Sequence, residues 1–171
     1  MKLRHTVLVA LSSLALAGCG QLDSPVAPQK MIALAPVSAN LVTRPWEGSC
    51  EGIGTFRPNT AILDITGICR LSHLGLTTHV GVEIVGAVLN ATHTFTAANG
   101  DLLFTTTTGT AVLKPDFSGV IFSNIETVTG GTGRFANASG TATRIGSTVF
   151  SNSTATWEIQ GTLTYAASDR K

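Results

Sequence analysis

The sequence predicts a single all-β domain, a barrel or a sandwich of antiparallel strands, from Trp46 to about residue 166. Three observations favour this class. Apolar and polar residues alternate with a period of two in several segments, β-branched residues and Gly occur throughout, and no segment shows helical spacing. About seven or eight strands fit this length, and we favour a barrel because closing the sheet leaves no unpaired edge strand.

Residues 1–18, before this domain, have the three-part organisation of a secretory signal peptide. Lys2 and Arg4 give a positive start, an uncharged apolar run follows, and small residues precede Cys19. The apolar run is too short to form a stable transmembrane helix. An ordinary signal peptide followed by an incidental Cys would also fit this organisation.

The ending Leu16-Ala17-Gly18-Cys19 resembles the lipobox of bacterial lipoproteins. That resemblance implies cleavage before Cys19, lipidation of its thiol, and an extracytoplasmic protein held on the cell envelope by its lipid. Gly20 stands where the family's inner-membrane retention signal has Asp, which implies the outer membrane in a Gram-negative host. Two or three acyl chains give durable anchoring, whereas one chain is marginal.

Residues 19–45 are predicted to be a lipidated N-terminus and a flexible tether. Pro25, Pro28, Pro36 and Pro45 interrupt this stretch and disfavour regular strand pairing. The barrel domain is then predicted over residues 46–166, with residues 167–171 as a C-terminal tail.

Charge argues against nucleic acid as a partner. The chain has 11 basic and 10 acidic residues, and removal of residues 1–18 takes away Lys2 and Arg4. The mature protein is then close to neutral with few charges, so it has no field that would attract a polyanion.

Alternation is clear in three segments of the domain. In the last, Trp157, Ile159, Gly161, Leu163 and Tyr165 share one face. The other two are residues 61–71, where apolar residues alternate with Asp64, Thr66 and Arg70, and residues 79–84, where Val80, Val82 and Ile84 alternate with His79, Gly81 and Glu83.

Asn99-Gly100 lies between two Thr-rich strands and predicts a two-residue type I′ hairpin. Such a turn pairs Ala98 with Asp101 and places Phe95 opposite Phe104 on a shared face.

The segment Gly130-Gly131-Thr132-Gly133-Arg134-Phe135 resembles the glycine turn of plant dirigent proteins and of allene oxide cyclase-like barrels. The segments 96–101 and 161–165 are similar to bacterial members of that barrel group. The resemblance implies an eight-stranded antiparallel barrel with a central cavity, and a homo-oligomer that is a trimer in the plant proteins. It carries over no catalytic residue and does not imply cyclase activity. Physically, Gly130, Gly131 and Gly133 allow a tight reversal, and Phe135 can plug the barrel end.

Cys50 and Cys69 are the two thiols that remain after lipidation of Cys19. Both lie on apolar faces of neighbouring predicted strands, and a turn near Pro58-Asn59 brings them roughly opposite, offset by about two residues. Because the compartment is oxidising, we predict a disulfide between them. The alternative is two buried free thiols.

Two further residues are candidates for chemistry in the cavity. His93 shares a face with Phe95, Leu102 and Phe104, and Glu126 alternates with Val120, Phe122 and Val128, so both are expected to point inward. A buried carboxyl has a raised pKa and can transfer protons. The alternatives are a hydrogen-bonded core His, and a Glu that pairs with Arg70 or Arg144 or that a bulge turns outward.

No metal site or cofactor is predicted. His73 and His79 flank the Gly75-Leu76 turn and could meet across a hairpin, but no Cys or carboxylate has metal-ligand spacing beside them.

Three functions fit these features. The first is a lipid-anchored barrel that binds a small, largely apolar molecule or serves as an envelope module without chemistry. The second is an isomerase or cyclase that uses an interior carboxylate, and the third is a surface module whose Thr-rich strands meet a partner. Whether the protein is an enzyme is left open, with a non-enzyme favoured. The barrel interior distinguishes these three functions. A roomy apolar cavity favours the first, a wet cavity with converging Glu and His favours the second, and a filled core favours the third.

Overall fold

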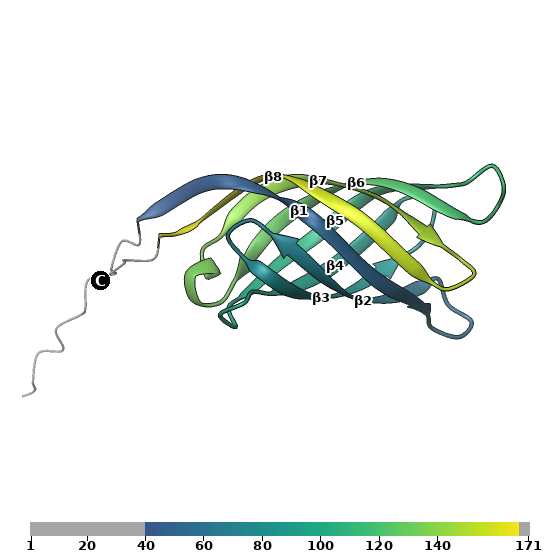
Figure 1. Ribbon diagram of the computed structural model, residues 1–171, viewed down its shortest axis with the longest axis horizontal. Helices are drawn as coiled ribbons and strands as arrows, with labels where there is room; N and C mark the ends of the chain where they lie inside the picture. The colour runs from purple at the N-terminus through teal and green to yellow at the C-terminus, as the bar shows by residue number, and fades with distance from the viewer. Residues whose placement is uncertain (1–39, 168–171) are drawn as a thin grey trace, which may run out of the picture. The chain divides into compact units, whose positions relative to one another are not determined.

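The computed structural model describes residues 40–167, which form a closed barrel of eight strands (Figure 1). Each strand pairs antiparallel with the next along the chain, and β8 returns to β1. The predicted eight-stranded antiparallel barrel is therefore confirmed. The elements are β1 Leu41–Phe56, β2 Ile62–Leu71, β3 Gly75–Ile84, β4 Leu89–Thr96, β5 Leu102–Leu113, β6 Gly119–Gly131, a 3₁₀ turn η1 Gly133–Phe135, β7 Ser139–Val149 and β8 Thr154–Ala166. Within this part of the chain, no helix is long and apolar enough to cross a membrane.

The domain begins earlier than the sequence suggested. Residues 41–45, predicted as the end of the tether, are the first residues of β1. Pro45 is tolerated there because β1 pairs with β8 at this point and with β2 only from Gly48 onward, so the strand has one neighbour. The predicted signal peptide, Cys19 and residues 19–39 of the predicted tether lie outside the described residues.

The predicted register of the 96–102 hairpin is wrong by one residue. Ala97 pairs with Asp101 through a backbone hydrogen bond of 2.9 Å, and Phe95 pairs with Leu103. A type I′ turn needs positive φ at both central residues, but in this turn only Gly100 has it, at 87°. The loop is therefore a three-residue one, and it turns Phe104 to the outer surface.

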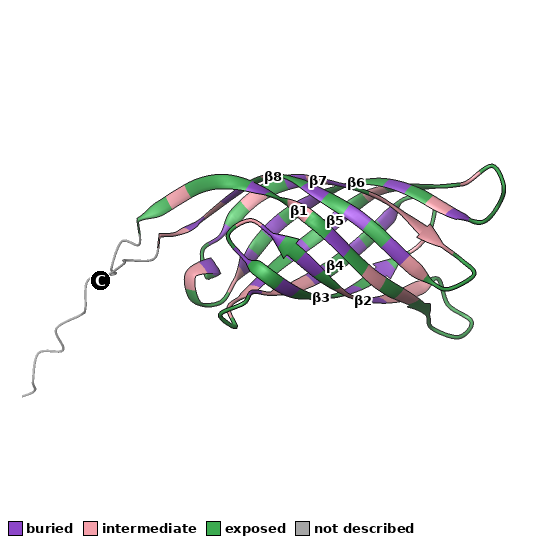
Figure 2. Ribbon diagram, viewed as in Figure 1, coloured by how far each residue is buried: buried purple, intermediate pink, exposed green. Residues whose placement is uncertain are grey.

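Strand β3 carries its apolar residues on the outside of the barrel. Val80, Val82 and Ile84 are 52%, 36% and 56% exposed, whereas His79 and Glu83 are buried. The alternation predicted for this strand is present, but the polar set faces inward. Figure 2 shows the same alternation of buried and exposed positions along the strands.

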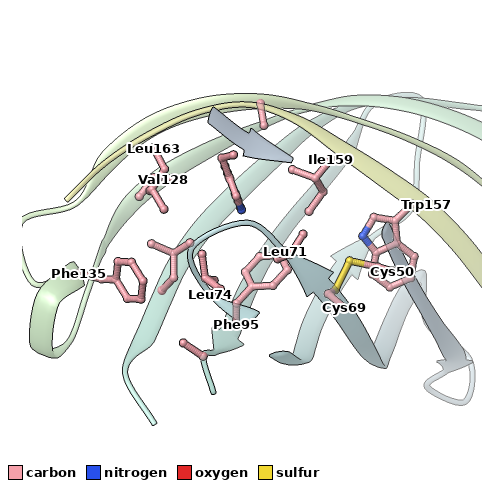
Figure 3. Packing of buried hydrophobic residues seen from close by; sticks show 14 of the residues in the cluster. Cys50, Cys69, Leu71, Leu74, Phe95, Val128, Phe135, Trp157, Ile159 and Leu163 are labelled. Atoms are coloured by element: carbon pink, nitrogen blue, oxygen red, sulfur yellow. A yellow bond between two sulfur atoms is a disulfide. The ribbon is translucent and has the colours of Figure 1, made fainter. Parts of the chain in front are cut away.

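One end of the barrel is closed by packed side chains. Phe135, in η1, is fully buried and packs against Tyr165, with ring centroids 5.5 Å apart. Arg134 lies over both rings, 4.7 Å and 5.6 Å from their centroids, and forms an ion pair with Asp101 at 3.7 Å. Figure 3 shows Phe135 beside Leu163, Val128 and Leu74 at this end. The segment after the glycine turn thus places Phe135 in the packed end of the barrel.

Two of the three turn glycines have backbone conformations that favour Gly, with φ of 130° at Gly130 and 54° at Gly133. A Cβ at Gly133 would lie 2.0 Å from the Asp101 carboxylate. The turn can therefore approach Asp101 closely because residue 133 has no side chain.

Cys50 and Cys69 form the predicted disulfide (Figure 3). The two residues are direct partners in the β1–β2 ladder, rather than offset by two residues as expected. The bond lies inside the barrel wall near Trp157 and joins β1 to β2 at mid-height.

Candidate functional site

The other end of the barrel opens into a cavity of about 530 Å³. All eight strands contribute to its wall, together with the loops that follow β3 and β7. Most of the lining is apolar, and the residues that define it best are Phe56, Leu63, Leu89, Leu113, Val120, Phe122 and Phe150. We call this cavity the mouth pocket. A concave, mainly apolar cavity with few polar groups is the usual form of a small-molecule site.

An ion pair lines the mouth pocket among these apolar groups. Glu83 of β3 and Arg144 of β7 join across the barrel, with Arg144 Nη1 donating a hydrogen bond of 2.7 Å to Glu83 Oε1. Both side chains are almost fully buried. The Arg144 guanidinium lies 5.0 Å from the centroid of Phe122 and 4.8 Å from the Trp157 ring, so two aromatic rings hold it in place.

Two histidines pack together deeper in the barrel. His79 Nε2 and His93 Nδ1 share a hydrogen bond of 3.0 Å. Gly81 makes room for this contact, because a Cβ there would lie 2.2 Å from His93 Nδ1. Burial, and secondly the charge of Arg144, lower the pKa of His79 to about 3 and that of His93 well below its usual value. Both rings are therefore neutral at physiological pH.

Glu126 of β6 is completely buried, as its alternation with Phe122 and Val128 predicts. Thr105 donates a hydrogen bond of 2.5 Å to its Oε1. Burial raises the pKa of Glu126, while Arg144 and the Thr105 hydrogen bond oppose that rise. Its Oε2 has no hydrogen-bond partner among the described residues.

These polar side chains belong to a set of buried polar residues on β3 to β7, which we call the polar belt. It consists of Thr77, His79, Glu83, His93, Thr105, Thr107, Asn124, Glu126 and Arg144. Several of its polar atoms have no hydrogen-bond partner among residues 40–167, including Asn124 Oδ1 and Nδ2, His93 Nε2 and Arg144 Nε. An unpartnered buried polar atom costs about 1–3 kcal/mol, so each of these atoms lowers stability unless water or a ligand satisfies it.

The two predicted cavity residues lie in the belt but not in the pocket wall. Glu126 and His93 are both inside the barrel, yet the residues that line the mouth pocket include neither. Arg144, considered as a partner for Glu126, pairs with Glu83 instead, and Arg70 lies on the outer surface. Leu102 and Phe104 do not share the face of His93, because of the shifted register described above.

Glu83, the acidic residue that lines the mouth pocket, was not among the candidate residues predicted from the sequence. Its signal was present: His79, Gly81 and Glu83 alternate as polar or small residues on one face of a strand. In a barrel with a polar interior, that face points inward.

His73 and His79, which could have met across the β2–β3 hairpin, lie apart. His73 lies exposed in the β2–β3 turn near Tyr165, while His79 is buried against His93. Over the described part of the chain, no group of three or more His, Cys, Asp or Glu is arranged to hold a metal ion.

The sequence matches no family model and no curated protein. Its fold is similar to that of the pterocarpan synthase dirigent protein GePTS1, with a TM-score of 0.56 and 14% sequence identity, over 77% of this chain and 89% of that one. The chain thus has the dirigent-like barrel fold that its glycine turn suggested. At this identity the similarity shows the fold alone.

Proposed function

We propose that this protein binds a small, largely apolar molecule in the mouth pocket. The observation that carries the proposal is a cavity of about 530 Å³, walled mainly by apolar side chains, with the Glu83–Arg144 pair among them. A dirigent-like barrel with such a cavity fits a binding role. The enzyme alternative has less support, because Glu126, its candidate carboxylate, is not in the pocket wall.

A neutral apolar dye tests the proposal. Nile red should bind to the purified domain with a rise in fluorescence, and Ala111→Trp should weaken binding about tenfold or more, because the new ring fills the pocket that Ala111 lines. Thr110→Trp is the matched control, since Thr110 lies on the outer face of the same strand. Equal binding by both variants would show that the dye binds elsewhere and would contradict the proposal.

The ligand itself can be sought by native mass spectrometry of the domain purified from its own host. A retained molecule adds its mass to the wild-type protein and is absent from Ala111→Trp. The same added mass on both proteins would place the molecule outside the pocket.

We further propose that the barrel is displayed outside the cytoplasm as a lipoprotein anchored through Cys19. The support is the signal-peptide organisation of residues 1–18, the lipobox-like ending, and the Cys50–Cys69 disulfide, which suits an oxidising compartment. Cys19→Ser should abolish palmitate incorporation and membrane fractionation while leaving the barrel folded. Palmitate labelling of that variant would contradict the proposal.

A further inference from the structure

The polar part of the mouth pocket is dominated by Arg144. Its guanidinium is buried, flanked by the rings of Phe122 and Trp157, and it lines a cavity whose other walls are mainly apolar. Taken alone, a fixed guanidinium in an apolar cavity selects a carboxylate or another anion, because charge-assisted hydrogen bonds are strong there. The identity of the preferred ligand therefore depends on what else neutralises this charge.

Glu83 already fills that role. Its carboxylate accepts the 2.7 Å hydrogen bond from Arg144 Nη1 and also lines the pocket. An anion that entered would have to displace Glu83 or lie beside its negative charge in a region of low dielectric constant. Burying a charge without a partner is strongly unfavourable.

No second cation is available to hold such an anion. Among residues 40–167, Arg144 is the only buried Lys or Arg. His79 and His93 are uncharged at neutral pH because burial and Arg144 lower the pKa of each. The barrel interior therefore has no positive charge left uncompensated.

Hydrogen bonding remains possible without a charge on the ligand. A guanidinium has five N–H donors, and one of them is used by Glu83. A hydroxyl or carbonyl oxygen can accept from such a group and brings no charge into the pocket.

We infer that the mouth pocket selects molecules with an apolar body and an uncharged oxygen, and that Glu83 is the residue that excludes carboxylates. This inference rests on the proposed binding function and names the class of ligand for that site. Glu83 acts by neutralising the charge of Arg144. Removing the Glu83 carboxylate should therefore convert a pocket for alcohols and ketones into one that accepts carboxylic acids.

Displacement of Nile red by a matched pair of probes tests the inference. Geraniol and geranate share one apolar chain and differ in an alcohol or a carboxylate at its end. At neutral pH, wild type should prefer geraniol about tenfold or more, and Glu83→Gln should reduce or reverse that preference by strengthening geranate binding. Asp64→Asn is the matched control, because Asp64 pairs with Arg57 and does not line the pocket. It should keep the wild-type preference.

A double variant separates charge from shape. Glu83→Gln with Arg144→Gln removes both charges, so it should not gain affinity for geranate. A gain equal to that of Glu83→Gln would show that the effect does not arise from Arg144, and it would overturn the inference. If Glu83→Gln does not fold, a gain in geranate affinity by the double variant over wild type would still overturn the inference.

Two further results would overturn the inference. One is that geranate displaces Nile red from wild type as readily as geraniol does, and the other is that geraniol fails to displace the dye. Neither result affects the proposed binding function, which is contradicted only if Nile red binds equally to Ala111→Trp and Thr110→Trp.

Discussion

The two ends of this barrel differ in what fills them. At the closed end, Phe135 is fully buried against Tyr165, and Arg134 ties the turn to Asp101 and to the His73 carbonyl. At the open end, Phe56 and Phe150 are about half exposed around the mouth pocket. Packing at one end can stabilise the barrel while the other keeps an unfilled cavity. Binding sites are drawn from the less stable parts of a fold.

The comparison predicts very different effects for two Phe residues. Phe135→Ala should lower the free energy of unfolding by about 3–5 kcal/mol, because it leaves a cavity in packed surroundings. Phe150→Ala, at 49% exposure, should cost about 1 kcal/mol or less. Urea denaturation of both variants measures the difference. Equal losses would show that the two ends contribute alike.

The disulfide lies between the two ends of the barrel and should stabilise both of them. Cys50→Ala with Cys69→Ala should lower the free energy of unfolding by about 3 kcal/mol in the chain-entropy model, because the bond closes a loop of sequence separation 19. The control is Ser49→Ala with Arg70→Ala, which changes the neighbouring pair of the same ladder, whose side chains face outward. This control should change the free energy of unfolding by about 0.5 kcal/mol or less. If hydrogen exchange shows that amide protection is lost only at the open end, the closed end does not depend on the disulfide.

Two Arg residues sharpen the comparison further. Arg134→Met should cost about 1–2 kcal/mol, because it removes contacts with two rings and leaves the His73 carbonyl without this donor. Arg57→Met, at the open end, removes an exposed pair with Asp64 and should leave the thermal midpoint unchanged. Thermal melts at low and high salt test this, since only an exposed pair is strongly screened. A midpoint drop for Arg57→Met as large as that for Arg134→Met would refute the distinction.

The smallest effect is expected at Glu126, and there the sign is informative. Burial in the folded protein raises the pKa of Glu126 above the ordinary Glu value of 4.5, so the unfolded chain releases this proton first as pH rises. Wild-type stability is therefore lost between pH 4.5 and the folded pKa. Glu126→Gln, which stays uncharged, should be more stable than wild type at about pH 7.5 and similar to it at about pH 4.

Glu158→Gln is the control for this variant, since Glu158 is exposed on β8. Thermal melts at both pH values suffice. Destabilisation by Glu126→Gln at neutral pH would mean that the ionised carboxylate is stabilised by Arg144 more than burial opposes it.

Local patterns predicted the fold but not the composition of the pocket. The alternation around Glu126 is regular, so its inward position followed from the sequence. The β4–β5 register, and with it the outward position of Phe104, could not be predicted from the sequence because Asn-Gly fits both a two-residue and a three-residue loop. Glu83 was missed since the apolar residues of β3 lie on the outer surface, where hydrophobicity no longer indicates the interior. Its pairing with Arg144, 61 residues away, depends on barrel closure.

The described chain starts and finishes at the closed end of the barrel. The Ala167 backbone N–H donates a hydrogen bond of 2.8 Å to the Asn40 carbonyl, next to the β1–β8 pairing. A short peptide could therefore join these two residues, and new chain ends could be opened in a mouth loop such as 114–118, as circular permutation requires. For the native order of the chain, the same geometry means that both ends of the described domain lie at the end of the barrel opposite the mouth pocket.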